Sequence, residues 1–287
     1  MRQLEIEIAG LEPGTRLLAP AGMCSPHDAV TRTTVTGGDI RAVTLEAELG
    51  LAALCIEATG GALTLTHEIA PAPQEQGYPE VIFAPRVTPY TVAAEDLVRA
   101  SQEIAARAGG GMAGLRALVA EAEARFTYAH PEVRFNDGTD AVPYLSCGTT
   151  PGSCVDINTY LVASLRAAGF EAGYVYGYFF PAEKGGVTDD AHCWVVTRHA
   201  GEVLEWDIAH HIKAGLGPTQ PALDPRPGWR VALGHSMGHA YRLDDGTARF
   251  KLLSEPMRAG PDGAWHHVPL VARLPAPVAA SELRDLA

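Results

Sequence analysis

The residues best suited to chemistry lie in one stretch, Cys147 to Leu161, in which Gly and Pro residues lead up to Cys154. Beyond Cys154 the chain shows the apolar spacing of a buried helical face and then a capping glycine: Ile157, Leu161, Leu165, Ala168 and Gly169. The spacing predicts a helix over about 154–168. A thiol in the first turn of a helix faces unpaired backbone N–H groups and the positive end of the helix dipole, which favour the thiolate. Cys154 is therefore a candidate nucleophile.

A histidine and an aspartate on the strands that follow could serve this thiol. The period changes from about 3.6 to 2 after the helix, which predicts strands over 171–180, 191–197 and 202–208. The last two flank the short polar segment 198–201 in the manner of a β-hairpin.

The hairpin register predicts which residues face each other. If Thr197 pairs with Glu202, His192 lies directly opposite Asp207, with Cβ atoms about 4.5–5.5 Å apart. An odd-length loop would shift this register by one residue and weaken the pairing. A carboxylate on one ring nitrogen fixes the imidazole tautomer and leaves the other nitrogen to take a proton from a thiol.

Several motifs occur in a fixed order around these residues: Gly152-Ser153-Cys154-Val155-Asp156, Ser164-Leu165-Arg166-Ala167-Ala168-Gly169-Phe170, Gly177-Tyr178, Ala191-His192-Cys193-Trp194-Val195 and Trp206-Asp207. Together they resemble the core of the transglutaminase-like cysteine enzymes, over roughly residues 95–215. Trp229 to His235 is similar to a further family segment. The sequence departs from the family at Cys193, where alanine is usual, and in having no proline after Asp207.

The resemblance implies an α+β fold, with a papain-like, transglutaminase-like catalytic core behind an N-terminal β domain. It implies a triad in which Cys154 is the nucleophile, His192 the general base and acid, and Asp207 the orienting carboxylate. Acyl transfer would run through a thioester, with no metal and no organic cofactor.

The oxyanion would be held by the Cys154 backbone N–H and a second donor upstream of it. Tyr128 and Tyr144 are the candidates, with a slight preference for Tyr128. Ser153 and Trp194 are further candidates for the oxyanion or substrate site, although strand packing explains Trp194 more simply.

Three functions remain open at this point. The first and preferred one is a hydrolase that cuts an amide or peptide bond, because an accessible thioester hydrolyses by default. The second is an acyltransferase that passes the acyl group to an amine, either cross-linking or forming a small amide. The third is a non-catalytic binding module on the same fold. The expected partner is a peptide or small amide substrate.

Composition and charge indicate which partners and which cellular location to expect. The 287 residues carry a formal charge of −12 and contain no Lys/Arg cluster, so no nucleic-acid partner is expected. No apolar run is long enough to span a membrane, and no membrane partner is expected. The first residues alternate charged and apolar residues like a strand and do not resemble a signal peptide, which favours a cytoplasmic protein. The five cysteines are widely spread without a C-x-x-C pair, as in reduced proteins.

The domain organisation follows from composition shifts. Short alternating runs separated by turn signals predict an N-terminal β domain over 1–90, with a hairpin turn at Thr59 to Ala62. A Pro-rich link leads to the catalytic core over 91–215, which opens with helices over 94–108 and 115–124. Residues 216–287 are expected as a β-rich extension packing on the core, with the last ten or so as a helix or loose tail.

Some chemistry-bearing residues have simpler explanations. Cys147 is a rival nucleophile but has no helix directly behind it. Asp156 suits a helix cap as well as a site. The histidine pairs at 210–211, 235–239 and 266–267 lack a third ligand at matching spacing, so no metal site is expected.

Overall fold

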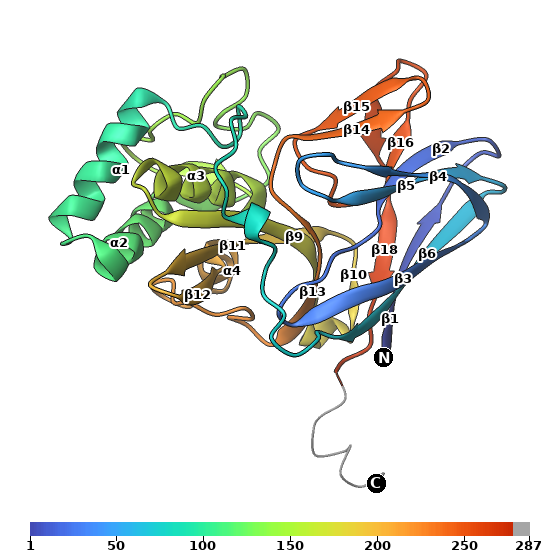
Figure 1. Ribbon diagram of the computed structural model, residues 1–287, viewed down its shortest axis with the longest axis horizontal. Helices are drawn as coiled ribbons and strands as arrows, with labels where there is room; N and C mark the ends of the chain where they lie inside the picture. Colours follow the sequence, from blue (N-terminus) through green and yellow to red (C-terminus); the bar gives the residue numbers. More distant parts are fainter. Residues whose placement is uncertain (278–287) are drawn as a thin grey trace, which may run out of the picture.

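The computed structural model describes residues 1–277, and Figure 1 shows two bodies side by side, a β-sandwich and a mixed unit of helices and sheet. The predicted helix or tail at the C-terminus lies outside the described residues. The α-helices are α1 (Glu95–Arg107), α2 (Gly111–Ala124), α3 (Cys154–Ala167) and α4 (Ile208–Ala214), with 3-10 turns at η1 (Glu80–Ile82) and η2 (Ala182–Lys184). None of the helices within residues 1–277 combines the length and apolar character needed to cross a membrane.

The strands belong to five sheets. In chain order they are β1 (Arg2–Ala9), β2 (Arg16–Pro20), β3 (Asp28–Thr36), β4 (Gly38–Leu45), β5 (Ala52–Ala58), β6 (Ala62–Pro71), β7 (Phe126–Tyr128), β8 (Thr150–Gly152), β9 (Glu171–Pro181), β10 (Val187–Thr188), β11 (Ala191–His199), β12 (Glu202–Trp206), β13 (Gly228–His235), β14 (His239–Leu243), β15 (Gly246–Phe250), β16 (Met257–Ala259), β17 (Trp265–His267) and β18 (Leu270–Arg273).

The sandwich consists of two five-stranded sheets, in the orders β10-β18-β1-β6-β3 and β17-β16-β2-β5-β4. Alternation places Leu4, Ile6 and Ile8 of β1 in its core, each at most 1% exposed. The hairpin predicted at Thr59 to Ala62 is wrong, because β5 and β6 belong to different sheets. Each of these strands is flanked on both edges by other partners, so the glycines between them carry the chain from one sheet to the other.

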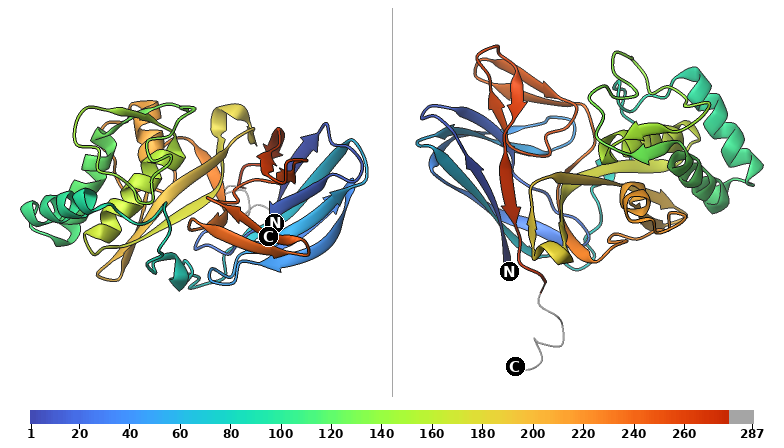
Figure 2. Two further views of the ribbon diagram at one scale, coloured as in Figure 1. Left: turned by 90° about the horizontal axis from the view of Figure 1, so that it is seen from above. Right: turned by 180° about the vertical axis from the view of Figure 1, so that it is seen from behind.

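The mixed unit of helices and sheet is built on the antiparallel sheet β12-β11-β9-β13, with α1, α2 and α3 gathered on one side of it (Figure 2). β9 is buried from Ala172 to Pro181, which explains its continuous apolar sequence. Tyr174 and Tyr176 pack with α3 on one face, and Val175 packs with Trp194 on the other. The strand therefore forms the centre of the core beneath the Cys154 helix.

The β11–β12 hairpin has a shorter loop than expected. His199 pairs with Glu202, and the two loop residues Ala200 and Gly201 have φ of 52° and 82°, as a tight turn of this kind requires. The predicted pairing of Thr197 with Glu202 is wrong by two residues, an even shift that keeps every side chain on its expected face. β12 ends at Trp206, so Asp207 begins α4 and does not lie in the strand.

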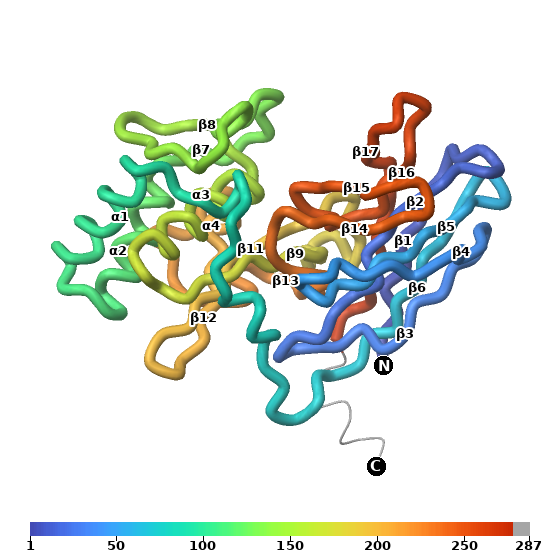
Figure 3. Tube along the Cα trace, turned by 45° about the horizontal axis from the view of Figure 1, so that its top comes forward, coloured from blue at the N-terminus to red at the C-terminus, as the bar shows by residue number. Residues whose placement is uncertain are grey.

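The region expected as an extension over 216–287 contributes strands to both bodies. β13 is an edge strand of the sheet that contains β9 and β11, whereas β16, β17 and β18 belong to the two sheets of the sandwich. One apolar cluster also joins the bodies, since Tyr178 and Phe180 of β9 share it with strands β1 and β6. The tube in Figure 3 shows the C-terminal strands returning between the two bodies.

Candidate active site

Cys154 occupies the first position of α3, and the turn around it is fixed by hydrogen bonds. Oδ2 of Asp156 accepts from the backbone N–H and the hydroxyl of Ser153, both at 2.9 Å. The Arg134 guanidinium donates to the same carboxylate oxygen at 2.8 Å. Asp156 is thus a buried cap, and it fixes the helix start that presents Cys154.

His192 connects this thiol to Asp207. Its Nε2 lies 2.8 Å from Oδ2 of Asp207. Cys154 is also close enough to help raise the pKa of the ring. Because Nε2 is committed to the carboxylate, Nδ1 is the nitrogen left for the thiol. Burial lowers the pKa of His192, but the charge and hydrogen bond of Asp207 outweigh it and raise the pKa to about 9.

Two residues that sequence reasoning missed hold Asp207. Arg230 of β13 donates to its Oδ2 at 2.9 Å and reaches Asp224 at 2.7 Å. The His210 backbone N–H donates to its Oδ1 at 3.0 Å, so Asp207 is the N-cap of α4. Burial opposes ionisation, but these partners and His192 hold the pKa of Asp207 well below its usual range.

His210 also stacks on His192, with ring centroids 4.0 Å apart and an interplanar angle of 10°. Its Nδ1 lies 2.8 Å from the same Asp207 oxygen that His192 uses. Burial and the neighbouring His192 lower the pKa of His210 to about 4, so it stays neutral beside a charged partner. The three-residue spacing from Asp207 to His210 was the available signal, since it is the spacing of a helix cap.

His192, Asp207 and His210 are also a group that could hold a metal ion, because their ligand atoms lie within 4.8 Å of one another. Arg230 already binds the oxygen that an ion would use, and its charge would repel a cation. The arrangement therefore fits hydrogen bonding better than coordination.

Cys193 is buried beneath Cys154 on the strand next to α3. The Asn158 amide, one turn along α3 from the nucleophile, donates to the Cys193 carbonyl at 2.9 Å and to its Sγ at 3.4 Å. A hydrogen bond with Cys193 and then burial raise the pKa of the Cys154 thiol, and His192 opposes them.

Residues 99–204 match the family model of the transglutaminase-like superfamily. This stretch is a transglutaminase-like domain. The resemblance seen in the sequence and the predicted fold class are confirmed. No curated protein matches the chain.

Solved structures are similar to the chain at low sequence identity. A candidate cysteine protease from Cytophaga hutchinsonii has a TM-score of 0.51 and 12% identity, over 95% of this chain and 96% of its own. The periplasmic domain of TgpA from Pseudomonas aeruginosa, bound to ethylmercury, has a TM-score of 0.39 and 14% identity, over 75% of this chain and 92% of its own.

The other residues expected at the site lie in different surroundings. Tyr128 of the transglutaminase-like domain pairs with Gly152, two residues before Cys154. Burial and the nearby Cys154 raise its pKa. The Tyr144 hydroxyl accepts from Arg125 at 3.2 Å, in a cluster apart from these contacts.

Ser153 is the N-cap of α3, as described above. Trp194 is buried beneath Arg230, whose guanidinium lies 4.8 Å from the indole centroid. It therefore supports the residue that holds Asp207.

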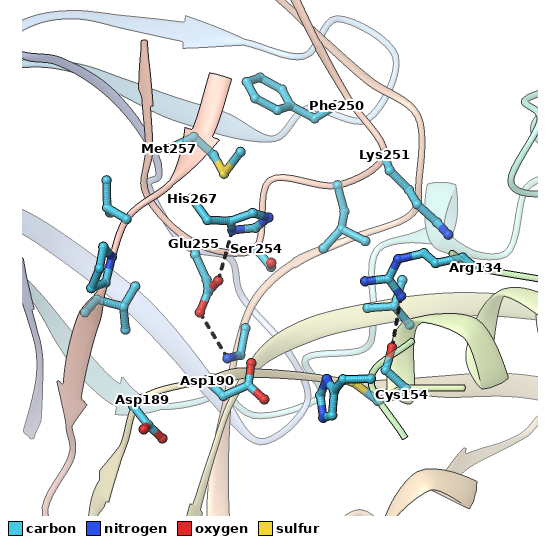
Figure 4. Close-up of a pocket in the computed structure, with 18 of the residues that line it drawn as sticks. Arg134, Cys154, Asp189, Asp190, Phe250, Lys251, Ser254, Glu255, Met257 and His267 are labelled. Atoms are coloured by element: carbon cyan, nitrogen blue, oxygen red, sulfur yellow. Dashed lines mark hydrogen bonds and ion pairs between the residues drawn. The ribbon is translucent and has the colours of Figure 1, made fainter. Parts of the chain in front are cut away.

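A cleft of about 770 Å³ opens beside Cys154, between the transglutaminase-like domain and the C-terminal segment (Figure 4). Lys251 and Arg134 lie on the side of the thiol, and Asp190 and Glu255 lie across from them. Glu255 accepts the Ala191 backbone N–H at 3.1 Å, which ties the C-terminal wall to the strand start before His192. The Cys154 thiol therefore lines a cleft that could hold a substrate.

Proposed function

We propose that the protein is a cysteine-dependent hydrolase of amide or peptide bonds, with Cys154, His192 and Asp207 as its triad. The observation that carries the proposal is His192, whose Nε2 lies 2.8 Å from Oδ2 of Asp207 and whose pKa is raised by both Asp207 and the neighbouring Cys154. A ring between a thiol and a carboxylate can hold the thiol proton while the carboxylate stabilises the imidazolium.

The reaction starts with the Cys154 proton already on His192, whose raised pKa keeps the ring protonated at neutral pH, and the sulfur attacks the substrate carbonyl. The C–N bond breaks as His192 returns the proton to the leaving amine, which leaves a thioester. Water then attacks the thioester with His192 as base, releasing the acid and the free thiol. The Cys154 backbone N–H at the start of α3 and the Tyr128 hydroxyl are the donors we assign to the oxyanion.

A peptide or small amide would bind in the cleft beside Cys154. All five cysteines are free thiols in the structure, which supports the cytoplasmic location we propose.

The alternative is an acyltransferase, and one feature of the cleft favours it. Burial and the neighbouring Glu255 raise the pKa of Asp190, so two carboxylates lie close together in the cleft. An ammonium or amine group would relieve their repulsion, and an acceptor amine held there could compete with water for the thioester.

Alkylation tests whether Cys154 is activated at all. Iodoacetamide at pH 7 should label Cys154 faster than the exposed Cys147, and Cys154→Ala should abolish amidase activity while Cys147→Ala retains it. Equal labelling rates together with an active Cys154→Ala variant would rule out the catalytic function and leave a binding module. Product analysis of an acyl-enzyme formed from 4-nitrophenyl acetate, with and without a primary diamine, separates the hydrolase from the transferase.

A further inference from the structure

Positive charge without a matching carboxylate gathers on one side of the cleft. Lys251, just after β15, lines the cleft and makes no ion pair with any carboxylate of residues 1–277; its ammonium lies 5.2 Å from the Tyr90 ring. Arg249 on β15 lines the same cleft, is exposed, and likewise makes no ion pair within the described part of the chain. The chain as a whole has a net charge of −12, so these two cations are a local excess of positive charge.

Arg134 adds a third cation close to Lys251, and Figure 4 shows the two side chains approaching each other above Cys154. Burial lowers the pKa of Lys251, and so does Arg134, whereas Asp156 and Asp137 act in the opposite direction. Neither carboxylate forms an ion pair with Lys251, and Oδ2 of the fully buried Asp156 is already bound by Arg134 and Ser153. Lys251 and Arg249 are therefore the surplus charges.

An anion placed beside Lys251 would relieve this repulsion and give the ammonium an acceptor it lacks. The thiol of Cys154 lines the same cleft, so such an anion would belong to the molecule undergoing reaction. The anionic groups of a peptide or amide are its acidic side chains and its terminal carboxylate.

We propose that Lys251, supported by Arg249 and Arg134, forms a subsite for a carboxylate of the substrate. This assignment rests on the proposed function, because it refers to the substrate of that reaction. The substrate would be an amide with an acidic residue or a free carboxylate close to the scissile bond. The subsite itself is a property of the cleft and is measured without turnover.

Two alkylating reagents of similar size test the subsite. Iodoacetate carries a carboxylate and iodoacetamide is neutral. In both reactions the Cys154 thiolate forms a bond to the CH2 carbon as the C–I bond breaks and iodide leaves, which gives a carboxymethyl or a carbamoylmethyl thioether. The measurement is the ratio of their rate constants at Cys154, followed by mass spectrometry of its peptide and divided by the same ratio for free cysteine. Lys251→Met should lower this ratio about fivefold and leave the iodoacetamide rate unchanged.

Arg249→Gln should lower the ratio about twofold, and because Arg249 is exposed this variant does not depend on core packing. Lys251→Arg should retain the wild-type ratio. Arg99→Met is the matched control: it removes one positive charge from the exposed face of α1 and should leave the ratio unchanged. A ratio that is unchanged in both Lys251→Met and Arg249→Gln overturns the subsite.

The same data separate this inference from the proposed function. If iodoacetamide labels Cys154 no faster than free cysteine but the ratio still falls in Lys251→Met, the nucleophile assignment fails and the anion subsite stands. If Cys154 is hyper-reactive and the ratio is unchanged in Lys251→Met and Arg249→Gln, the nucleophile assignment stands and the anion subsite fails. Peptide amides that differ only by Glu or Gln next to the scissile bond extend the test to kcat/KM, with the Glu substrate favoured by wild type and not by Lys251→Met.

Discussion

Charged residues around Cys154 fall into two groups that differ in their partners. In the buried group, His192, Asp207 and Arg230 are at most 7% exposed, and each is bound to an ionic partner. On the wall formed by the C-terminal segment, Lys251 and Arg249 have no ion pair within residues 1–277. Buried charges that are all ion-paired hold a fixed geometry, whereas charges without an ion pair can bind a ligand. The difference separates a buried cluster with a fixed geometry from a cleft wall whose cations are open to a ligand.

Removing the charge of Asp207 should perturb the buried cluster of His192, Asp207 and Arg230 most severely. In Asp207→Asn the amide retains the volume but no longer stabilises the imidazolium, so we expect kcat to fall about a thousandfold or more. The alkaline limb of the pH–rate profile should move from about pH 9 down toward the ordinary histidine value of 6.5. Steady-state kinetics between pH 5 and 10 measure both effects.

The same pair also affects stability. A raised folded-state pKa of His192 stabilises the fold fully below about pH 6.5, and this contribution is lost as pH rises through about 9. Urea unfolding should show this dependence in wild type and not in Asp207→Asn. Asp224→Asn, which removes the other partner of Arg230, is the control and should retain the wild-type pH profile.

Arg230→Met should act on folding more than on chemistry. It leaves the Asp207 carboxylate without its guanidinium in a fully buried position, and breaking such a pair costs about 3–5 kcal/mol in the free energy of unfolding. Urea denaturation measures the loss. Arg226→Met, whose partner Glu183 is exposed, should lose less than about 1 kcal/mol. Equal losses in the two variants would contradict the role assigned to Arg230.

His210→Phe should have a smaller, purely local effect. The phenyl ring can keep the stacking on His192 but removes the nitrogen beside Asp207, so we expect kcat to fall about tenfold. Because Asp207 then has one partner fewer, its carboxylate should raise the pKa of His192 further. The alkaline limb of the pH–rate profile should therefore move to higher pH. His211→Phe is the matched control, because His211 bonds the Asp207 backbone carbonyl and not its carboxylate. If the alkaline limb also shifts in His211→Phe, the effect comes from a change in α4 as a whole and not from the His210 nitrogen.

Cys193→Ala should produce the smallest change and in the opposite direction. Contact with Cys193 raises the pKa of Cys154, so its removal should increase the thiolate fraction and speed iodoacetamide labelling about threefold at pH 7. The substitution also restores the alanine usual in the family. Cys55→Ala, on β5 of the sandwich, should leave the labelling rate unchanged. A slower rate in Cys193→Ala would mean that Cys193 aids the nucleophile.

Local sequence signals predicted the parts of the molecule that depend on near neighbours. The start of α3 at Cys154 and its end before Gly169 follow from apolar spacing and a glycine cap. The hairpin register failed because the polar loop concealed a two-residue turn, in which Ala200 adopts a positive φ without the usual Asn or Asp. Because the error was even, it left His192 and Asp207 in reach of each other.

Contacts between distant segments were beyond the reach of pattern reasoning. Arg230 lies in a strand whose sequence gives no sign that its guanidinium meets Asp207. Lys251 and Glu255 follow β15, and the pairing of β16 with β2 and of β18 with β1 helps to bring their segment over the cleft. Register between such strands is set by tertiary packing.

The return of the last strands to the first sheets has a consequence during synthesis. β1 and β2 leave the ribosome early, but β18 and β16, which cover one edge of each, are made only after the whole transglutaminase-like domain. Until then the nascent chain carries two uncovered strand edges, the kind of surface on which chaperones act and aggregates form. A chain that stops before residue 256 would keep every residue of the triad and still lack the strands that close its sandwich.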